Sequence, residues 1–269
     1  MLAMADNTSF INDKDLISIF DSTDALGNDQ CCLLYTSTEQ LIKTIAESGA
    51  DLIELGIPFS DPTAEGPVIQ AANLRAINGG ATTDKIFAMV ERIRPQIKIP
   101  MVFMTYANVV FGYGTERFIH KAAEVGIDGL ILPDVPYEEK GDFLPYCQQN
   151  GLELISLVAP TSDDRIAMIA REAEGFVYCV SSLGVTGERS KFSNHIGEVV
   201  SLVRHFTSVP TAIGFGISTP QQASDMAMLA DGVIVGSAIV KLVAQYGRQA
   251  VPHVAEYVHS MKTAISEIK

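Results

Sequence analysis

Two glutamates occur in settings that favour acid–base chemistry. Glu54 lies inside the apolar stretch of residues 52–56, where its carboxyl group is expected to be buried. Because burying a lone charge is costly, such a group is either hydrogen-bonded as part of the framework or protonated and ready to exchange a proton. The residue type alone leaves both interpretations of Glu54 open.

A second carboxylate follows in a stretch rich in proline. Residues 58–67 contain three prolines and Glu65, which predicts a stiff loop able to hold this side chain over a site. Glu65 would also fit a solvated loop position. A lone glutamate in such a loop is more often solvated than catalytic, so the residues by themselves make Glu65 only a candidate second carboxylate.

Three glycine-containing segments indicate a phosphate site. Residues 184–187, 214–216 and 236–237 each follow or end an apolar run. Glycine lets the backbone approach an anion closely, and the residue after it can offer an N–H group at the start of a helix. A single glycine in a turn usually serves only the turn, whereas three such segments in consecutive units favour a bound phosphate group.

The other reactive side chains give weaker indications. The five histidines and four cysteines show no metal-ligand spacing, so we expect no metal site. No lysine is predicted at the carboxyl end of a strand, which disfavours an aldolase that works through an imine. Tyr106 and Tyr178 fall in the later halves of two apolar runs, where they could line a pocket for an aromatic ligand or belong to the core.

The hydrophobic pattern predicts the scaffold that must position these residues. Most apolar runs are near-continuous, as in strands buried on both faces of a parallel sheet. The predicted strands are residues 31–36, 51–58, 100–107, 129–135, 152–160, 175–181, 210–217 and 232–235. The predicted helices are residues 39–48, 83–93, 115–125, 138–150, 163–172, 196–206, 220–229 and 238–246.

This alternation favours an α/β fold with a single (β/α)8 barrel, a TIM barrel, over an open doubly wound sheet. We expect residues 31–269 to form the catalytic barrel, with residues 251–268 as an extra C-terminal helix. Residues 1–30 are polar, with one short helical pattern at 15–20, and are predicted to be an N-terminal lead-in segment. Chemistry in such barrels collects at the carboxyl ends of the strands, where both glutamates and the glycine segments fall.

The composition excludes several classes of protein. The chain has 269 residues, of which 47% are hydrophobic, and no run of 18 apolar residues and no secretory leader pattern, so we expect a soluble cytoplasmic protein without membrane contact. The net charge of −13 argues against a nucleic-acid partner, because binding to a phosphate backbone requires clustered lysine and arginine. A small phosphorylated ligand remains compatible, since backbone N–H groups can hold it locally.

The sequence resembles the tryptophan synthase alpha chain family in six motifs that occur in the expected order between about residues 38 and 265. The motifs are Glu54-Leu-Gly-Ile-Pro-Phe-Ser-Asp-Pro, Tyr106-Ala-Asn, Pro133-Asp-Val-Pro, Gly184-Val-Thr-Gly, Gly214-Phe-Gly-Ile-Ser and Gly236-Ser-Ala-Ile-Val. The resemblance implies a retro-aldol cleavage of indole-3-glycerol phosphate to indole and glyceraldehyde 3-phosphate. It also implies that this chain needs no cofactor or metal and works in an α2β2 complex with a pyridoxal-phosphate-bearing tryptophan synthase beta chain.

The resemblance implies roles for individual residues as well. Glu54 matches the glutamate that protonates the indole ring carbon bearing the side chain, and Glu65 takes the place of the second catalytic carboxylate, which accepts the indole N–H proton. The positions that match backbone phosphate binding are Gly187, Gly216, Gly236 and Ser237. The positions that match the lining of the indole pocket are Tyr178 and Phe215.

Two departures from the family pattern bear on activity. The second carboxylate of the family is usually Asp, whereas Glu65 carries one more methylene and places its carboxyl group about 1 Å further out. The first strand of the family is usually followed by Gly-Asp-Pro, whereas residues 35–38 run directly into the predicted helix. One alternative is therefore a catalytically weak barrel that mainly binds and activates a beta chain. Another alternative is a different phosphate-binding barrel, such as a phosphoribosyl isomerase. Glu54 and the Pro-Phe-Ser-Asp-Pro loop argue against this alternative.

Overall fold

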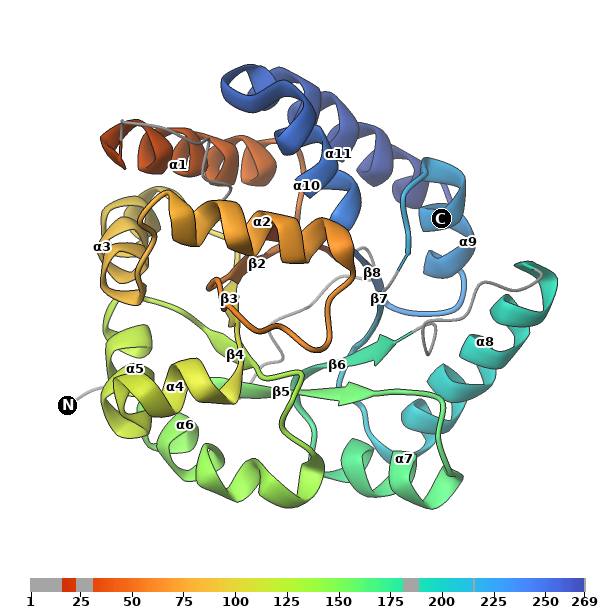
Figure 1. Ribbon diagram of the computed structural model, residues 1–269. Coiled ribbons are helices and arrows are strands. Elements are labelled where there is room, and N and C mark those ends of the chain that lie inside the picture. The colour runs from red at the N-terminus through yellow and green to blue at the C-terminus, as the bar shows by residue number, and fades with distance from the viewer. Residues whose placement is uncertain (1–15, 23–30, 181–188, 215, 269) are drawn as a thin grey trace.

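The computed structural model describes residues 16–22, 31–180, 189–214 and 216–268. Its centre is a parallel sheet that curls round and closes in the order β1 to β8 (Figure 1). The strands are β1 (Leu16–Ser22), β2 (Leu52–Gly56), β3 (Met101–Met104), β4 (Gly129–Ile131), β5 (Glu153–Val158), β6 (Glu174–Val180), β7 (Thr211–Gly214) and β8 (Gly232–Val235). The predicted α/β class with a parallel sheet is confirmed.

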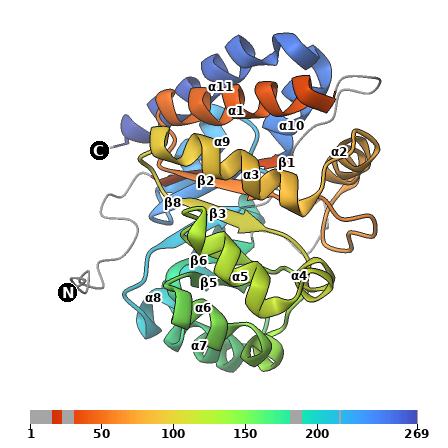
Figure 2. The ribbon, with the colours of Figure 1, turned by 90° about the vertical axis from the view of Figure 1, so that its left-hand side faces the viewer.

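Helices surround the sheet on its outer side, as Figure 2 shows from the side. They are α1 (Cys31–Glu47), α2 (Pro67–Asn78), α3 (Thr83–Ile93), α4 (Ala107–Tyr113), α5 (Thr115–Glu124), α6 (Leu144–Asn150), α7 (Asp163–Arg171), α8 (Arg189–Phe206), α9 (Pro220–Ala227), α10 (Ser237–Tyr246) and α11 (Ala250–Ser266). Short 3-10 helices are η1 (Arg94–Gln96), η2 (Tyr137–Asp142) and η3 (Gly247–Gln249). Within the described residues, no helix has the length and apolar character needed to cross a membrane.

The core has two layers because strand side chains alternate between the two faces of the sheet. The outer layer packs the strands against the helices. The inner layer fills the barrel and consists of Leu52, Val102, Ile131, Ile155, Phe176, Tyr178, Ala212 and Ile234. Glu54 lies two residues after Leu52 on the same strand, so the alternation directs its carboxyl group into the barrel as well.

The strand predicted at residues 31–36 is wrong, because these residues begin helix α1. The first strand is β1, which lies within the segment predicted to be a lead-in and pairs in parallel with β2 and β8. A short apolar run is compatible with a strand or with one turn of a buried helix, so periodicity could not separate the two. The predicted departure at residues 35–38 therefore falls inside α1 and does not follow a strand.

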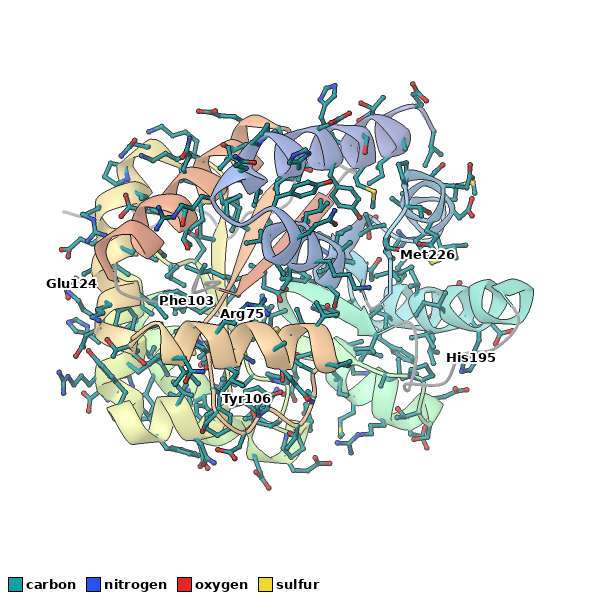
Figure 3. The ribbon with its side chains drawn as sticks, turned by 45° about the horizontal axis from the view of Figure 1, so that its top comes forward. Arg75, Phe103, Tyr106, Glu124, His195 and Met226 are labelled. Atoms are coloured by element: carbon teal, nitrogen blue, oxygen red, sulfur yellow. The ribbon has the colours of Figure 1, made fainter. Side chains whose placement is uncertain are left out.

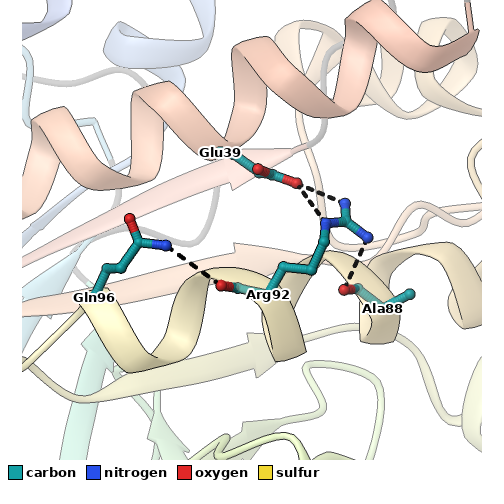
Figure 4. A network of polar contacts seen from close by, with 4 residues as sticks. All are labelled: Glu39, Ala88, Arg92 and Gln96. Atoms are coloured by element: carbon teal, nitrogen blue, oxygen red, sulfur yellow. Dashed lines mark hydrogen bonds and ion pairs between the residues drawn. The ribbon is translucent and has the colours of Figure 1, made fainter.

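Helix α1 is tied to α3 by a small polar network (Figure 4). The Arg92 guanidinium donates to Glu39 Oε1 over 3.1 and 2.6 Å and to the Ala88 carbonyl oxygen over 3.0 Å. Gln96 Nε2 donates to the Arg92 carbonyl oxygen over 3.4 Å. An exposed ion pair stabilises a fold only slightly, but this one shows that α1 lies beside α3.

The remaining predicted elements agree with the structure, apart from the following differences. From Leu16 onwards, the helical pattern at residues 15–20 is strand β1, and α8 begins at residue 189 rather than 196. Strand β8 and helix α3 match residue for residue. Helices α2 and α4 were not predicted, although Gly66 and Pro67 at the start of α2 form a recognisable helix beginning. The helix predicted at residues 138–150 is divided into η2 and α6, with Phe143 between them. Figures 1 and 2 agree that α2 and the segment before it lie over one end of the barrel.

Candidate active site

A cavity of about 620 Å³ lies at the carboxyl ends of the strands. Its apolar walls include Ile69, Met104, Leu157, Val180 and Ile234. Its polar lining comprises Glu54, Glu65, Tyr178, Gly216, Ser218, Gly236, Ser237, Lys241 and Tyr257. Both candidate glutamates and part of the predicted phosphate site therefore share one cavity.

Glu54 is held inside the barrel by β2, and only 1% of its surface is exposed. Its Oε2 atom has no hydrogen-bond partner among the described residues. Burial raises the pKa of Glu54 from 4.5 to about 8, because the low-dielectric interior disfavours the charged form. Of the two interpretations left open by the sequence, the geometry therefore favours a protonated carboxyl group available to donate a proton.

Tyr178 of β6 is the second polar side chain inside the barrel. Burial and the nearby carboxyl group of Glu54 raise the pKa of Tyr178 well above its ordinary value, so its hydroxyl stays protonated. A Cβ atom placed on Gly214 would lie 2.5 Å from the Tyr178 hydroxyl oxygen. Gly214 thus makes room for the tyrosine ring, which is a different role from the anion contact that its motif suggested.

Glu65 lies in the segment between β2 and α2 and is held there by Tyr106. The Tyr106 hydroxyl donates a hydrogen bond to Glu65 Oε2 and accepts one from the Ala64 N–H group over 2.8 Å. Gln70 Nε2 donates to the Glu65 carbonyl oxygen over 2.8 Å. Tyr106 is not among the residues that line the cavity. It lies beside α2 and the segment before it (Figure 3), where it holds the loop carboxylate.

The surroundings of Glu65 alter its proton affinity. Burial raises the pKa of Glu65, the hydrogen bond from Tyr106 opposes this, and the negative charge of Asp134 adds to the rise. Asp134 is itself held at the start of α4 by the Ala107 N–H group, at 3.0 and 3.2 Å from its two carboxyl oxygens. Glu65 is therefore a stronger base than a solvated glutamate once it has lost its proton.

The same cavity also contains backbone positions predicted to bind phosphate. Gly236 is the N-cap of α10 and Ser237 its first residue, so unpaired N–H groups point from this helix end. Gly216 has a φ of +83°, and a Cβ atom placed there would meet nothing within 4 Å. The structure brings these three positions into the cavity of the glutamates. Gly187 and Phe215, also predicted for the site, lie outside the described residues.

Three cavity residues were missed by sequence reasoning. Lys241 lies one helical turn after Ser237 on α10 and is the only cationic side chain among the described residues of the lining. The helical spacing from Ser237 was a signal that could have identified it. Ser218 and Tyr257 carried no local signal, because Tyr257 belongs to α11 and reaches the cavity only through the fold. In the described part of the chain, no group of three or more His, Cys, Asp and Glu side chains could hold a metal ion.

The parallel sheet is closed, and a cavity lined by two glutamates lies at the C-terminal ends of its strands. These two features place the chain in the class of α/β barrel enzymes. Within that class the chain belongs to the tryptophan synthase alpha chain family, whose family model matches residues 30–266. The resemblance seen in the motifs is thereby confirmed.

Individual relatives agree with this family. The chain is 46% identical over 235 residues to the tryptophan synthase alpha chain of Lacticaseibacillus casei, covering 87% of this chain and 88% of that one. The structure of tryptophan synthase subunit alpha from Campylobacter jejuni matches with a TM-score of 0.83 at 32% identity, covering 96% of this chain and 100% of that one. A chain of Mycobacterium tuberculosis tryptophan synthase matches with a TM-score of 0.81 at 32% identity, covering 93% and 92%.

Proposed function

We propose that this chain is a lyase of tryptophan biosynthesis that cleaves indole-3-glycerol phosphate to indole and glyceraldehyde 3-phosphate. The proposal is supported mainly by the shared cavity. The buried carboxyl group of Glu54, the loop carboxylate of Glu65 and the N-terminus of α10 line it together with apolar side chains. Membership of the tryptophan synthase alpha chain family supports the same reaction.

The two carboxyl groups divide the proton transfers. Protonated Glu54 donates to the ring carbon that bears the glycerol phosphate, while ionised Glu65 accepts the proton of the indole nitrogen, which gives an electrophilic indolenine. The Glu54 carboxylate then takes the proton of the adjacent glycerol hydroxyl. The carbon–carbon bond breaks, its electrons return to the ring, and Glu65 returns the proton to nitrogen. Both glutamates end in their starting states, and no other reactant is consumed.

The rest of the cavity orients the substrate. The apolar walls suit an indole ring, and the start of α10 at Gly236 and Ser237 suits the phosphate group. Lys241 lies on the same helix and supplies positive charge to a cavity that otherwise contains two carboxyl groups. Tyr178 lines the cavity beside Glu54, and Gly187 and Phe215 belong to the same proposed site through their motifs.

The variant Glu54→Gln tests the assignment. It keeps the size of the side chain but has no acidic proton to transfer, so we expect release of indole from indole-3-glycerol phosphate to fall by at least about 100-fold. Glu153→Gln is the matched control, because Glu153 also has a pKa raised by burial but starts β5, at the other end of the barrel. Retention of substantial activity by Glu54→Gln would refute the role of Glu54.

The proposal extends to the architecture and the partner. The chain is a complete (β/α)8 barrel acting as one catalytic domain that includes β1, with α11 as the extra helix. It works in the cytoplasm with a tryptophan synthase beta chain in an α2β2 complex and carries no cofactor of its own. The alternative, a catalytically weak barrel that mainly binds and activates a beta chain, now rests mainly on Glu65. Measuring indole release with and without a beta chain separates the two, since no cleavage in either sample would exclude the lyase.

A further inference from the structure

Helix α11 lies outside the alternation of strands and helices, yet one of its side chains reaches the cavity. The helix packs against α1, α9 and α10 (Figure 1). Tyr257, near its middle, is partly buried with its ring against the hydrophobic core, and it also lines the cavity. Its hydroxyl donates a hydrogen bond to the carbonyl oxygen of Ser218 over 3.0 Å.

Ser218 is held from a second side by helix α9. The Ser218 N–H group donates to Gln222 Oε1 over 2.9 Å. Gln222 also completes a capping box with Thr219 at the start of α9. The segment after β7 is therefore held between α9 through Gln222 and α11 through Tyr257, two helices that contact each other.

The same segment carries one of the backbone positions at the phosphate end of the cavity. Gly216 precedes Ser218 by two residues, lines the cavity and has free space where a side chain would be. Its φ of +83° is a conformation that glycine adopts freely, so the local chain does not itself fix the direction of this backbone. The hydrogen bonds made by Ser218 limit this freedom.

We propose that Tyr257 is a positioning residue for the phosphate group of the substrate, because its hydroxyl holds residues 216–218, which line the same cavity as the start of α10. This inference rests on the proposed function, since it assumes that a phosphate group occupies the space between Gly216 and Ser237. Burial raises the pKa of Tyr257 to about 12, so the hydroxyl remains a donor throughout the neutral range. The role passes through the backbone of Ser218 and requires no contact between Tyr257 and the reacting atoms.

Tyr257→Phe tests the inference because it removes the donor and keeps the ring that packs on the core. Because this bond lies within the protein, only the order that it gives to residues 216–218 is passed on to phosphate binding, as a factor of about 3 to 10. We expect the KM for indole-3-glycerol phosphate to rise by about this factor with kcat nearly unchanged, since the phosphate is held equally in the ground and transition states. The Kd of sn-glycerol 3-phosphate, measured by calorimetry, should rise equally, whereas the Kd of indole should not change.

Tyr246→Phe is the matched control. Tyr246 is a tyrosine of α10 that stacks on His253 of α11 at a ring-centroid distance of 3.6 Å and is not among the cavity-lining residues. Unchanged binding of glycerol phosphate by Tyr257→Phe would overturn the inference, as would an equal loss of indole binding, which indicates general loosening. Failure of the unmodified chain to bind glycerol phosphate would overturn the proposed phosphate site itself. Binding without cleavage would overturn the lyase activity, while the ratio of Kd values would still decide the role of Tyr257.

Discussion

The buried carboxyl group of Glu54 should lower the stability of the folded chain near neutral pH. Its pKa rises from 4.5 in the unfolded chain to about 8 in the fold. Below pH 4.5 both states hold the proton, and Glu54 contributes no pH dependence. Between these two pKa values only the unfolded chain ionises, so the free energy of unfolding falls with rising pH, by about 1.4 kcal/mol for each pH unit. The accumulated cost at pH 7 is about 3 kcal/mol, and it stops growing above about pH 8.

Glu54→Gln removes this cost, because the amide does not ionise in either state. The free energy of unfolding of the variant minus that of the wild type should therefore grow by about 3 kcal/mol between pH 4.5 and pH 7. Urea denaturation followed by circular dichroism at several pH values measures this difference, and subtraction cancels the titration of all other groups. The variant should thus become more stable relative to the wild type as the pH rises, although it has lost activity. A difference that stays constant over this range would show that Glu54 titrates normally in the fold, and the proton-donor role would lose its basis.

Two further variants test the loop carboxylate and the missed cation. Tyr106→Phe removes the hydrogen bond that lowers the pKa of Glu65, so the acid limb of the pH–rate profile should move to higher pH. Activity should then fall more at pH 6 than at pH 8. An acid limb at the same pH as in the wild type would contradict the role of this hydrogen bond. Lys241→Met should raise the KM for indole-3-glycerol phosphate by about 5- to 10-fold, less so at high salt. Lys98→Met, before β3 at the far end of the barrel, is its control, and equal KM values for the two variants would exclude a role for Lys241.

The loss of stability caused by Glu54 is linked to its proposed function. A carboxyl group with hydrogen-bond partners would stabilise the fold, but its pKa would fall and it would lose its proton at neutral pH. The lack of a hydrogen-bond partner for Oε2 in the described part of the chain is therefore the same feature that destabilises the fold and keeps the proton available. Active sites commonly combine lower stability with a function of this kind.

Most of the barrel was predictable because local signals agreed there. Near-continuous apolar runs bounded by glycine, proline and capping residues, in regular alternation with helical patterns, favour strands at β2 to β8. The first unit failed because residues 31–36 and β1 are both short apolar stretches in a polar segment. Pairing of β1 with β2 and β8, rather than local propensity, decides which of the two is the strand.

The sequence by itself determined Glu54 as a candidate acid, the motifs that show the family and add Glu65, and the order of strands β2 to β8. These follow from residue types and spacing along the chain. Only the tertiary structure decided that Glu54 Oε2 has no hydrogen-bond partner among the residues described, that Tyr106 holds Glu65, and that α11 contributes Tyr257 to the cavity. The physical reason is that burial and contacts between distant residues arise when the sheet closes and the helices pack around it, and neither is encoded in any local stretch of the chain.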